Sequence, residues 1–386
     1  MSVQFEFTTV PRILFGAGAV KAVGENPKAF GACILVVTGR EPRRAEELIA
    51  DLRQRGAGVV AFAVAGEPEI ATVEQGIRLA KAEKCNSVIG FGGGSVIDAA
   101  KAIAALLTND GELLDYLEII GRGQTLTKWS APFFAIPTTA GTGSEVTRNA
   151  VLASPEHKLK VSLRSRLMLA KMAIIDPELT YDLPPALTAS TGLDALTQLI
   201  EPFVCSRANP MTDGLCVEGI RRVARSLRVA CADGKNKAAR EDMAVASLHG
   251  GLALANAGLG AVHGFAGPVG GSFPAPHGAI CAALLPHVMA ANISALRQRA
   301  PDGAALRRYD AEARLLTGDA GATADAGVDW AGRLVADLQI PRLGKYGVRE
   351  EHVADLVAKA ANASSMKANP IALTAEELAA TLRLAL

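Results

Sequence analysis

The chain has 386 residues, 49% of them hydrophobic, which is long for one hydrophobic core and predicts two domains. Its 40 basic and 39 acidic side chains give a formal net charge of +1. This balance gives no electrostatic reason to expect nucleic acid or an anionic membrane as partner, so small molecules are the expected ligands.

The six cysteines are scattered and form no CxxC pair, which argues against a disulfide framework and against a thiolate zinc knot. The start of the chain, MSVQFEFTTVPRILFG, lacks the basic end and the apolar stretch of a signal peptide. No run of about 18 apolar residues lies free of Gly, His and Pro, so we expect no membrane span and a cytoplasmic protein.

The first half alternates short β-branched runs with amphipathic stretches, which is typical of a parallel sheet covered by helices. Helices are predicted at 41–56 and 72–85, where apolar residues recur at helical spacing. Strands are predicted at 32–39, 58–64, 87–92, 133–138 and 172–177.

Strand signals stop after DPELTYDLPPAL (176–187), and Ala/Leu-rich segments of helical periodicity continue to the end. We therefore expect an α/β nucleotide-binding domain over 1–183 and an all-helical domain over 184–386, divided at the Pro-rich passage.

A long segment of the second half carries no charge: no Asp, Glu, Lys or Arg occurs between Asp242 and Arg297. Such a segment must be largely buried. It holds four of the six histidines, His249, His263, His277 and His287. Buried imidazoles need a hydrogen-bond partner or a metal ion.

A glycine-rich turn, GFGGGSVIDAAKAIA (90–104), runs from a strand into a helix. Gly92, Gly93 and Gly94 allow a tight turn, and the helix N-terminus favours an anion such as pyrophosphate. The alternative is a glycine-rich turn without a ligand. Ser95 and Asp98 have the spacing of a helix-capping pair, a role that is compatible with contact to a cofactor.

A second turn, PTTAGTGSEVTRNAV (137–151), also follows a strand and sets Thr138, Thr139, Thr142 and Ser144 among glycines. Hydroxyls and bare backbone suit phosphate, ribose or carboxamide contacts, and the alternative is an ordinary Ser/Thr turn.

The end of the first long strand, VVTGREPRR (36–44), bears on the choice of coenzyme. Enzymes that take NAD place an acid near the adenosine ribose, whereas the 2′-phosphate of NADP requires a cation there. Gly39 offers no acid, and Arg40, Arg43 and Arg44 follow closely, which favours NADP. The alternative is that these arginines form the solvated face of the next helix.

The helical stretch 188–205 carries Asp194 and Gln198 four residues apart, on one helix face. His263 and His277 are 14 residues apart, with two prolines and two glycines shortly before His277, so they require two helices joined by a turn. One carboxylate and two imidazoles would form a divalent-metal site with open positions. Each histidine taken alone fits a hydrogen-bonded core residue better than a ligand, whereas the three residues together in a glycine-lined apolar pocket favour the metal site.

These blocks together resemble the iron-containing, or group III, alcohol dehydrogenases, and the resemblance covers nearly the whole chain. It implies the dehydroquinate synthase-like architecture and a homodimer or larger homo-oligomer. The matching segments are FGAGAV (15–20), GGGSVIDAAKAIA (92–104), PTTAGTGSEVTRNAV (137–151), DPELTYDLPPAL (176–187), TGLDALTQLIEPFV (191–204), NAGLGAVHGFAGPVGGSFPAPHG (256–278) and NPIALTAEEL (369–378).

The resemblance also assigns residues. Lys160 joins the threonines of the second turn among the coenzyme-contacting positions, and the pyrophosphate would lie on Gly92, Gly93, Gly94 and Ser95. The metal positions, for Fe²⁺ or Zn²⁺, match Asp194, Gln198, His263 and His277, of which Asp194, His263 and His277 are the expected catalytic residues.

The chain departs from the family at two positions. The family usually has histidine where this chain has Gln198 and where it has Gly267. A glutamine oxygen is a weaker ligand than imidazole, and the second change removes a candidate proton relay.

We therefore expect an NAD(P)-dependent oxidoreductase that interconverts an alcohol and an aldehyde or ketone with the help of a metal ion. The stretch GGSFPAPHG (270–278) also resembles maleylacetate reductases, which act on carboxylated substrates and would need less help from a metal. A third hypothesis is a non-catalytic nucleotide-binding protein.

Overall fold

The computed structural model describes residues 4–25 and 30–386, which form two compact units. The α/β unit comprises Thr9–Thr139 and Gly143–Thr180. The helical unit comprises Tyr181–Leu386, the short segment Ala140–Thr142 and the N-terminal residues up to Thr8. The functional boundary expected at residue 183 stays a prediction.

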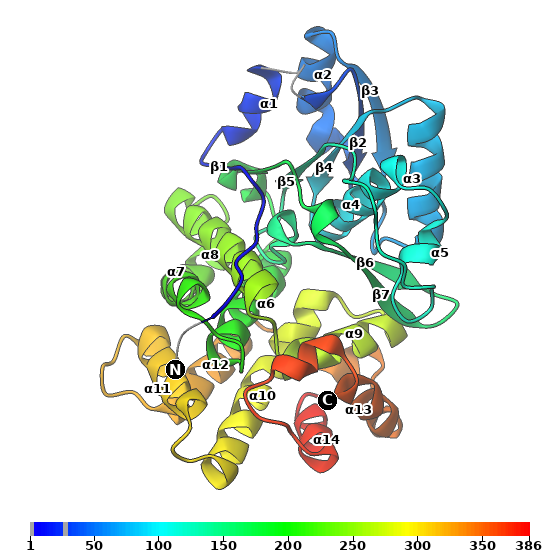
Figure 1. Cartoon of the computed structure of the whole chain (residues 1–386). Helices are drawn as coiled ribbons and strands as arrows, with labels where there is room; N and C mark the ends of the chain where they lie inside the picture. Colours follow the sequence, from blue (N-terminus) through cyan, green and yellow to red (C-terminus); the bar gives the residue numbers. More distant parts are fainter. Residues whose placement is uncertain (1–3, 26–29) are drawn as a thin grey trace. The chain divides into compact units, whose positions relative to one another are not determined.

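The α/β unit is built on a six-stranded, all-parallel sheet with the strand order β1-β8-β5-β4-β2-β3 (Figure 1). The five strands expected from the sequence are confirmed, and the short edge strand β1 is an addition. The strands are β1 (Ile13–Phe15), β2 (Cys33–Thr38), β3 (Gly58–Ala63), β4 (Ser87–Gly92), β5 (Phe133–Pro137) and β8 (Met172–Ile175).

Helices cover both faces of this sheet, and its central strands are apolar on both faces. Ile34 of β2 packs in one core cluster with Leu52 of α2. Gly90 of β4 points to the other face, where a Cβ atom built on it would lie 2.9 Å from Ala100 of α4. The helices of this unit are α1 (Ala22–Glu25), α2 (Glu46–Gln54), α3 (Ile70–Ala82), α4 (Gly94–Thr108) and α5 (Leu113–Tyr116).

The sheet is doubly wound, and its switch point lies between β2 and β4. The chain leaves β2 toward β3 on one side and leaves β4 toward β5 on the other, while β2 and β4 are neighbours. Ligands of such sheets bind at the carboxyl ends of the strands at this point. An antiparallel hairpin, β6 (Asn149–Ser154) and β7 (Leu159–Arg164), was not expected from the sequence.

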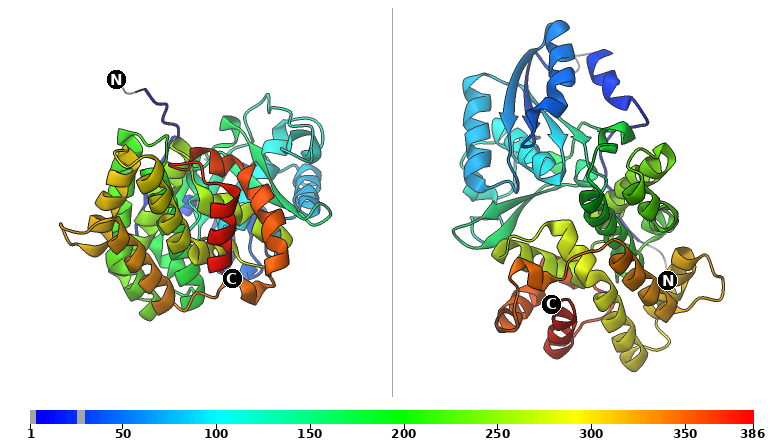
Figure 2. Two further views of the ribbon diagram at one scale, coloured as in Figure 1. Left: turned by 90° about the horizontal axis from the view of Figure 1, so that it is seen from below. Right: turned by 180° about the vertical axis from the view of Figure 1, so that it is seen from behind.

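The second unit is helical, as expected: no strand occurs in residues 176–386, all of which the structure describes. Figure 2 shows this unit from two further sides. Its helices are α6 (Pro185–Val204), α7 (Pro210–Ala232), α8 (Lys237–Asn256), α9 (Ala261–Ser272), α10 (His277–Arg299), α11 (Ala304–Thr317), α12 (Ala324–Asp337), α13 (Val353–Ala361) and α14 (Ala375–Leu384).

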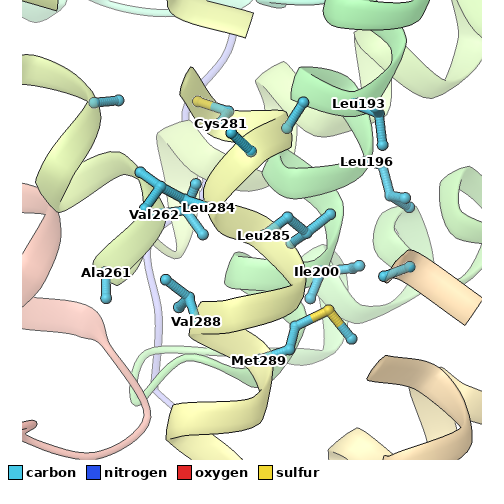
Figure 3. Packing of buried hydrophobic residues seen from close by; sticks show 14 of the residues in the cluster. Leu193, Leu196, Ile200, Ala261, Val262, Cys281, Leu284, Leu285, Val288 and Met289 are labelled. Atoms are coloured by element: carbon cyan, nitrogen blue, oxygen red, sulfur yellow. The ribbon is translucent and has the colours of Figure 1, made fainter. Parts of the chain in front are cut away.

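Helix α10 lies at the centre of this core, between α6 and α9 (Figure 3). Its Leu285 faces Ile200 of α6, and its Leu284 faces Val262 of α9. By length and hydropathy α10 is apolar enough to cross a membrane, but 78% of that stretch is buried inside the protein. The charge-free segment thus supplies core helices, as its composition predicts.

Candidate functional site

The predicted coenzyme turns meet at one edge of the sheet. Strand β4 pairs with β2 on one side and with β5 on the other, so the residues that follow these three strands are neighbours. These residues include Gly39 after β2, Gly93 after β4 and Thr138 after β5. The backbone N–H of Thr138 donates to the carbonyl of Gly92 over 3.0 Å, which joins the two turns.

The start of α4 is open to an anion. Gly93 is the N-cap residue and no side chain caps the helix, so the backbone N–H groups of Gly94 and Ser95 have no intrahelical partner. A Cβ atom at Gly92 would lie 2.6 Å from Cβ of Val96, so this turn requires glycine. The predicted cap by Ser95 and Asp98 is wrong, because α4 begins at Gly94 and places Ser95 inside the helix.

Asp98 instead fastens the second turn to α4. Its carboxylate accepts hydrogen bonds from the hydroxyl of Ser144 and, over 3.0 Å, from the backbone of Val151. The buried Lys101 lies 3.7 Å from the same carboxylate and donates to the carbonyl of Ser144 over 2.9 Å. Burial raises the pKa of Asp98 and lowers that of Lys101, and their mutual attraction opposes both shifts.

The other predicted coenzyme residues are divided between the α/β unit and the helical unit. Thr139 lies at the glycine turn, 3.4 Å from a Cβ position built on Gly93. Lys160 of β7 is largely buried and pairs with Glu67, with 3.0 Å between Nζ and Oε1. Thr142 belongs to the helical unit.

In the helical unit, three helices bring four potential metal ligands together: Asp194 of α6, His263 of α9, and His277 and Cys281 of α10. One donor atom of each lies within 4.8 Å of the other three. Oδ1 of Asp194 is 3.4 Å from Nε2 of His263 and 3.7 Å from Nε2 of His277.

The positions of these residues follow from how the helices begin. Helix α9 starts two residues before His263, where Ala261 donates its backbone N–H to Asn369 Oδ1 over 3.0 Å. Helix α10 starts at His277, directly after Pro276. Cys281 lies four residues further along α10 and therefore on the same face as His277.

Glu201, one turn beyond Gln198 on α6, orients His263. Nδ1 of His263 donates to Oε2 of Glu201 over 2.6 Å, because a carboxylate only accepts. Nε2 is thereby turned toward Asp194. Oε1 of Glu201 accepts from the backbone N–H of Val262 over 2.8 Å. Such a carboxylate behind an imidazole is the usual support of a metal-binding histidine.

Sequence reasoning missed Glu201 and Cys281. Their signals were a second carboxylate inside the same apolar helix as Asp194 and a cysteine four residues after a candidate histidine.

The electrostatics of the cluster favour a cation. Burial alone would raise the pKa of Asp194, but His277 and His263 hold it below its usual value. Burial alone would lower the pKa of His263 and His277. Electrostatic attraction to Cys281, and to Glu201 and Asp194 respectively, outweighs burial and raises both.

The same site contains unsatisfied acceptors. Among the described residues, Oδ1 of Asp194 and Oε1 of Gln198 are buried oxygens without a hydrogen-bond partner. Buried acceptors of this kind are costly unless a donor or an ion satisfies them. The donor set, an aspartate, two imidazoles and nearby sulfur and amide groups, fits a divalent transition-metal ion.

The remaining predicted positions lie apart from this cluster or are open. His249 bonds through Nδ1 to the carbonyl of Leu215 over 3.2 Å, and burial lowers the pKa of His249 and His287. No described atom beyond its chain neighbours and its own helix backbone lies within 4 Å of a Cβ atom built on Gly267. Gly267 therefore leaves open space where the resemblance implies a histidine side chain.

Comparisons with known proteins cover the whole chain. Residues 11–177 match the sequence model described as iron-containing alcohol dehydrogenase, and 188–386 match its C-terminal counterpart. A 1,3-propanediol dehydrogenase of Citrobacter freundii is 38% identical, with 97% of each chain covered. The long-chain-alcohol dehydrogenase 1 of Geobacillus thermodenitrificans is 39% identical, with 90% of this chain and 89% of that protein covered.

Among solved structures, a 1,3-propanediol oxidoreductase superposes with a TM-score of 0.91 at 35% identity and covers all of both chains.

Proposed function

Because the chain belongs to the iron-containing alcohol dehydrogenase family, we propose that Asp194, His263 and His277 hold the metal ion of an alcohol–carbonyl oxidoreductase. The chain is an NAD(P)-dependent alcohol oxidoreductase, as its full-length relatives are alcohol and propanediol dehydrogenases. The observation that carries the proposal is the convergence of these three side chains around a buried carboxylate oxygen that has no hydrogen-bond partner.

When bound, a divalent ion would supply Lewis acidity that polarises a carbonyl oxygen or acidifies an alcohol. The nicotinamide would exchange hydride with the carbon that bears this oxygen. The protein residues would hold the ion and orient its ligands. Asp194 contributes the negative charge, and Glu201 keeps Nε2 of His263 directed at the cluster. The amide of Gln198 either ligates weakly or hydrogen-bonds the substrate.

The coenzyme pyrophosphate would lie on the open first turn of α4, at Gly93, Gly94 and Ser95. Asp98 and Lys101 support this turn from behind, since their polar atoms are engaged with the second turn. The other proposed coenzyme contacts come from Gly39, Thr138, Thr139, Thr142 and Lys160.

We propose NADP as the preferred coenzyme. Arg44 is engaged with the carbonyl of Leu179, whereas the exposed Arg40 and Arg43 have no hydrogen-bond or ion-pair partner among the described residues. Two unengaged cations within four residues of Gly39 suit a 2′-phosphate. Arg40→Ala with Arg43→Ala should lower kcat/KM for NADPH and leave that for NADH unchanged, whereas Arg53→Ala should affect neither. Equal losses with both coenzymes would reject this preference.

The metal assignment is tested by His277→Gln and Asp194→Asn, with His287→Gln as the matched control from the same charge-free segment. The first two variants should lose bound metal and most turnover of primary alcohols while still binding coenzyme, and the control should retain both. Full turnover in either of the first two variants would refute the assignment.

The comparisons favour this function over the two alternatives, the maleylacetate-reductase-like enzyme and the non-catalytic nucleotide-binding protein. We also propose a cytoplasmic homodimer or larger homo-oligomer, on the strength of the family resemblance. Light scattering of the purified protein checks the oligomeric state directly.

A further inference from the structure

The sulfur of Cys281 points into the cluster that the proposed function assigns to the metal. Sγ lies 3.7 Å from Nε2 of His277 and 3.8 Å from Nε2 of His263. We propose that Cys281 is the fourth protein ligand of this ion, and that the site therefore selects Zn²⁺ over Fe²⁺. This inference rests on the proposed metal site but is separable from it by experiment.

The distances fit a tetrahedral donor set. With metal–nitrogen and metal–oxygen bonds of about 2.0 Å and a metal–sulfur bond of about 2.3 Å, nitrogen and oxygen donors stand about 3.3 Å apart and nitrogen and sulfur about 3.5 Å. The observed nitrogen–sulfur distances of 3.7 and 3.8 Å exceed that value by two or three tenths of an ångström. Small rotations of the side chains would bring the donor atoms to the tetrahedral distances.

The positions of the donors also fit. Cys281 is fully buried, and it comes from the same helix face as His277, so one helix supplies two donors at a four-residue spacing. Asp194 and His263 come from two other helices. Three rigid helices therefore fix all four donors, which is the arrangement that holds a metal site most precisely.

The chemistry of the donors decides the metal. Gln198, at the position where the resemblance implies histidine, offers only a neutral amide oxygen, which is a poor ligand for a transition-metal ion. The sulfur of Cys281 restores the count of four strong protein ligands. A thiolate beside two imidazoles and one carboxylate suits Zn²⁺, whereas ferrous iron gains less from a single soft ligand. On binding, the metal–sulfur bond forms and the thiol proton leaves to water.

The competing explanation is that Cys281 merely fills the core, where it packs with its neighbours on α10 (Figure 3). Cys216 of α7 is the matched control, because it is equally buried in the same core cluster and lies outside the group of potential ligands.

The experiment loads metal-free full-length protein with Co²⁺, as a spectroscopic substitute for Zn²⁺, and compares Cys281→Ser and Cys281→Ala with Cys216→Ser. The wild type and Cys216→Ser should show an intense sulfur-to-cobalt charge-transfer band in the near ultraviolet. Both Cys281 variants should lack that band. The dissociation constant for Zn²⁺, measured by competition with a chelating dye, should rise in both Cys281 variants by roughly 100-fold or more.

Circular dichroism and thermal melting confirm that each variant is folded before metal is added. If a Cys281 variant does not fold, the wild-type band alone still decides, since the other proposed ligands contain no sulfur.

The outcomes separate the two proposals. Cobalt that binds the wild type without the sulfur band, and with unchanged affinity in Cys281→Ser, overturns the role of Cys281 and leaves the metal site standing. Cobalt that fails to bind the wild type overturns both. A larger affinity for Fe²⁺ than for Zn²⁺ overturns the selectivity.

Discussion

The imidazole of His263 is oriented by a hydrogen bond at one of its two nitrogen atoms. Nδ1 donates to Glu201 over 2.6 Å, and Nε2 lies 3.4 Å from Asp194 Oδ1. Glu201 also accepts the backbone N–H of Val262, so the same carboxylate fixes the start of α9 and the ring that this helix carries. The precision of the proposed metal site therefore depends on a residue that would not itself face the ion.

Glu201→Gln tests this dependence. A neutral amide binds the imidazole less strongly and no longer enforces the tautomer that leaves Nε2 free, so affinity for Zn²⁺ should fall roughly 10- to 100-fold. Competition with a chelating dye measures the change, and Glu218→Gln, at a partly buried ion pair with Arg222 outside the cluster, is the control. Unchanged affinity in Glu201→Gln would show that Glu201 serves α9 alone.

Glu312 of α11 is another buried carboxyl group, outside the proposed metal cluster. Both of its oxygens are buried without a hydrogen-bond partner among the described residues, and burial raises its pKa to about 8. Between about pH 4.5, its value in an unfolded chain, and pH 8, the folded protein keeps a proton that the unfolded chain loses. This group therefore favours folding at low pH, and its contribution declines as the pH rises.

Glu312→Gln should remove this dependence. The stability of the wild type relative to the variant, measured by denaturant unfolding at pH 5, 6, 7 and 8, should decline steadily, with a slope approaching one proton per molecule. A difference that is constant across this range would show that Glu312 does not change its protonation on unfolding.

The roles of single residues could be predicted where the sequence offered a recognisable pattern of residue types. Asp194, His263 and His277 were identifiable as polar groups in apolar surroundings, and the structure brings them together. Cys281 was not identified, because a buried cysteine is an ordinary core residue and only its neighbours in space distinguish it. The spacing of Ser95 and Asp98 was misleading, since the helix begins after Gly93 and Asp98 is engaged with the second turn.

At the scale of helices and strands, the pattern of buried apolar residues made the prediction of these elements reliable. The strands of the parallel sheet are continuous apolar runs because helices cover both of their faces. The hairpin β6–β7 escaped prediction because its first strand begins inside a stretch rich in Gly, Ser and Thr that is typical of turns. Its pairing depends on a partner strand ten residues further along, which local composition does not reveal.

Helix α12 offers a matched pair of glycines for a test of packing. A Cβ atom on Gly332 meets no described atom within 4 Å beyond its chain neighbours and its own helix backbone, whereas one on Gly327 lies 3.2 Å from Cβ and 3.3 Å from Cα of Ala313 in α11. Gly332→Ala should therefore stabilise the protein by roughly 0.5–1 kcal/mol through the lower backbone entropy of the unfolded chain.

Gly327→Ala should destabilise it, because α11 and α12 must move apart. Thermal melting of both variants decides the matter. Stabilisation by Gly327→Ala, or destabilisation by Gly332→Ala, would contradict the packing of this helix pair.

At the scale of the whole chain, the two kinds of chemistry are carried by different units. The α/β unit supplies the open helix start and the glycine turn, whereas the helical unit supplies every candidate metal ligand. The sequence predicted this division from the change in periodicity after residue 187, because sheets and helix bundles bury apolar residues at different spacings. Thr142 departs from the simple order of the chain, since the short segment 140–142 belongs to the helical unit.

The central claim is that alcohol oxidation by this chain depends on an ion held by Asp194, His263 and His277. The most direct measurement is the initial rate of coenzyme reduction with a primary alcohol before chelation, after removal of metal and after return of Zn²⁺, with bound metal quantified at each stage. We predict loss of activity with the metal and recovery near one ion per chain. Full activity in protein shown to be free of metal would contradict the claim.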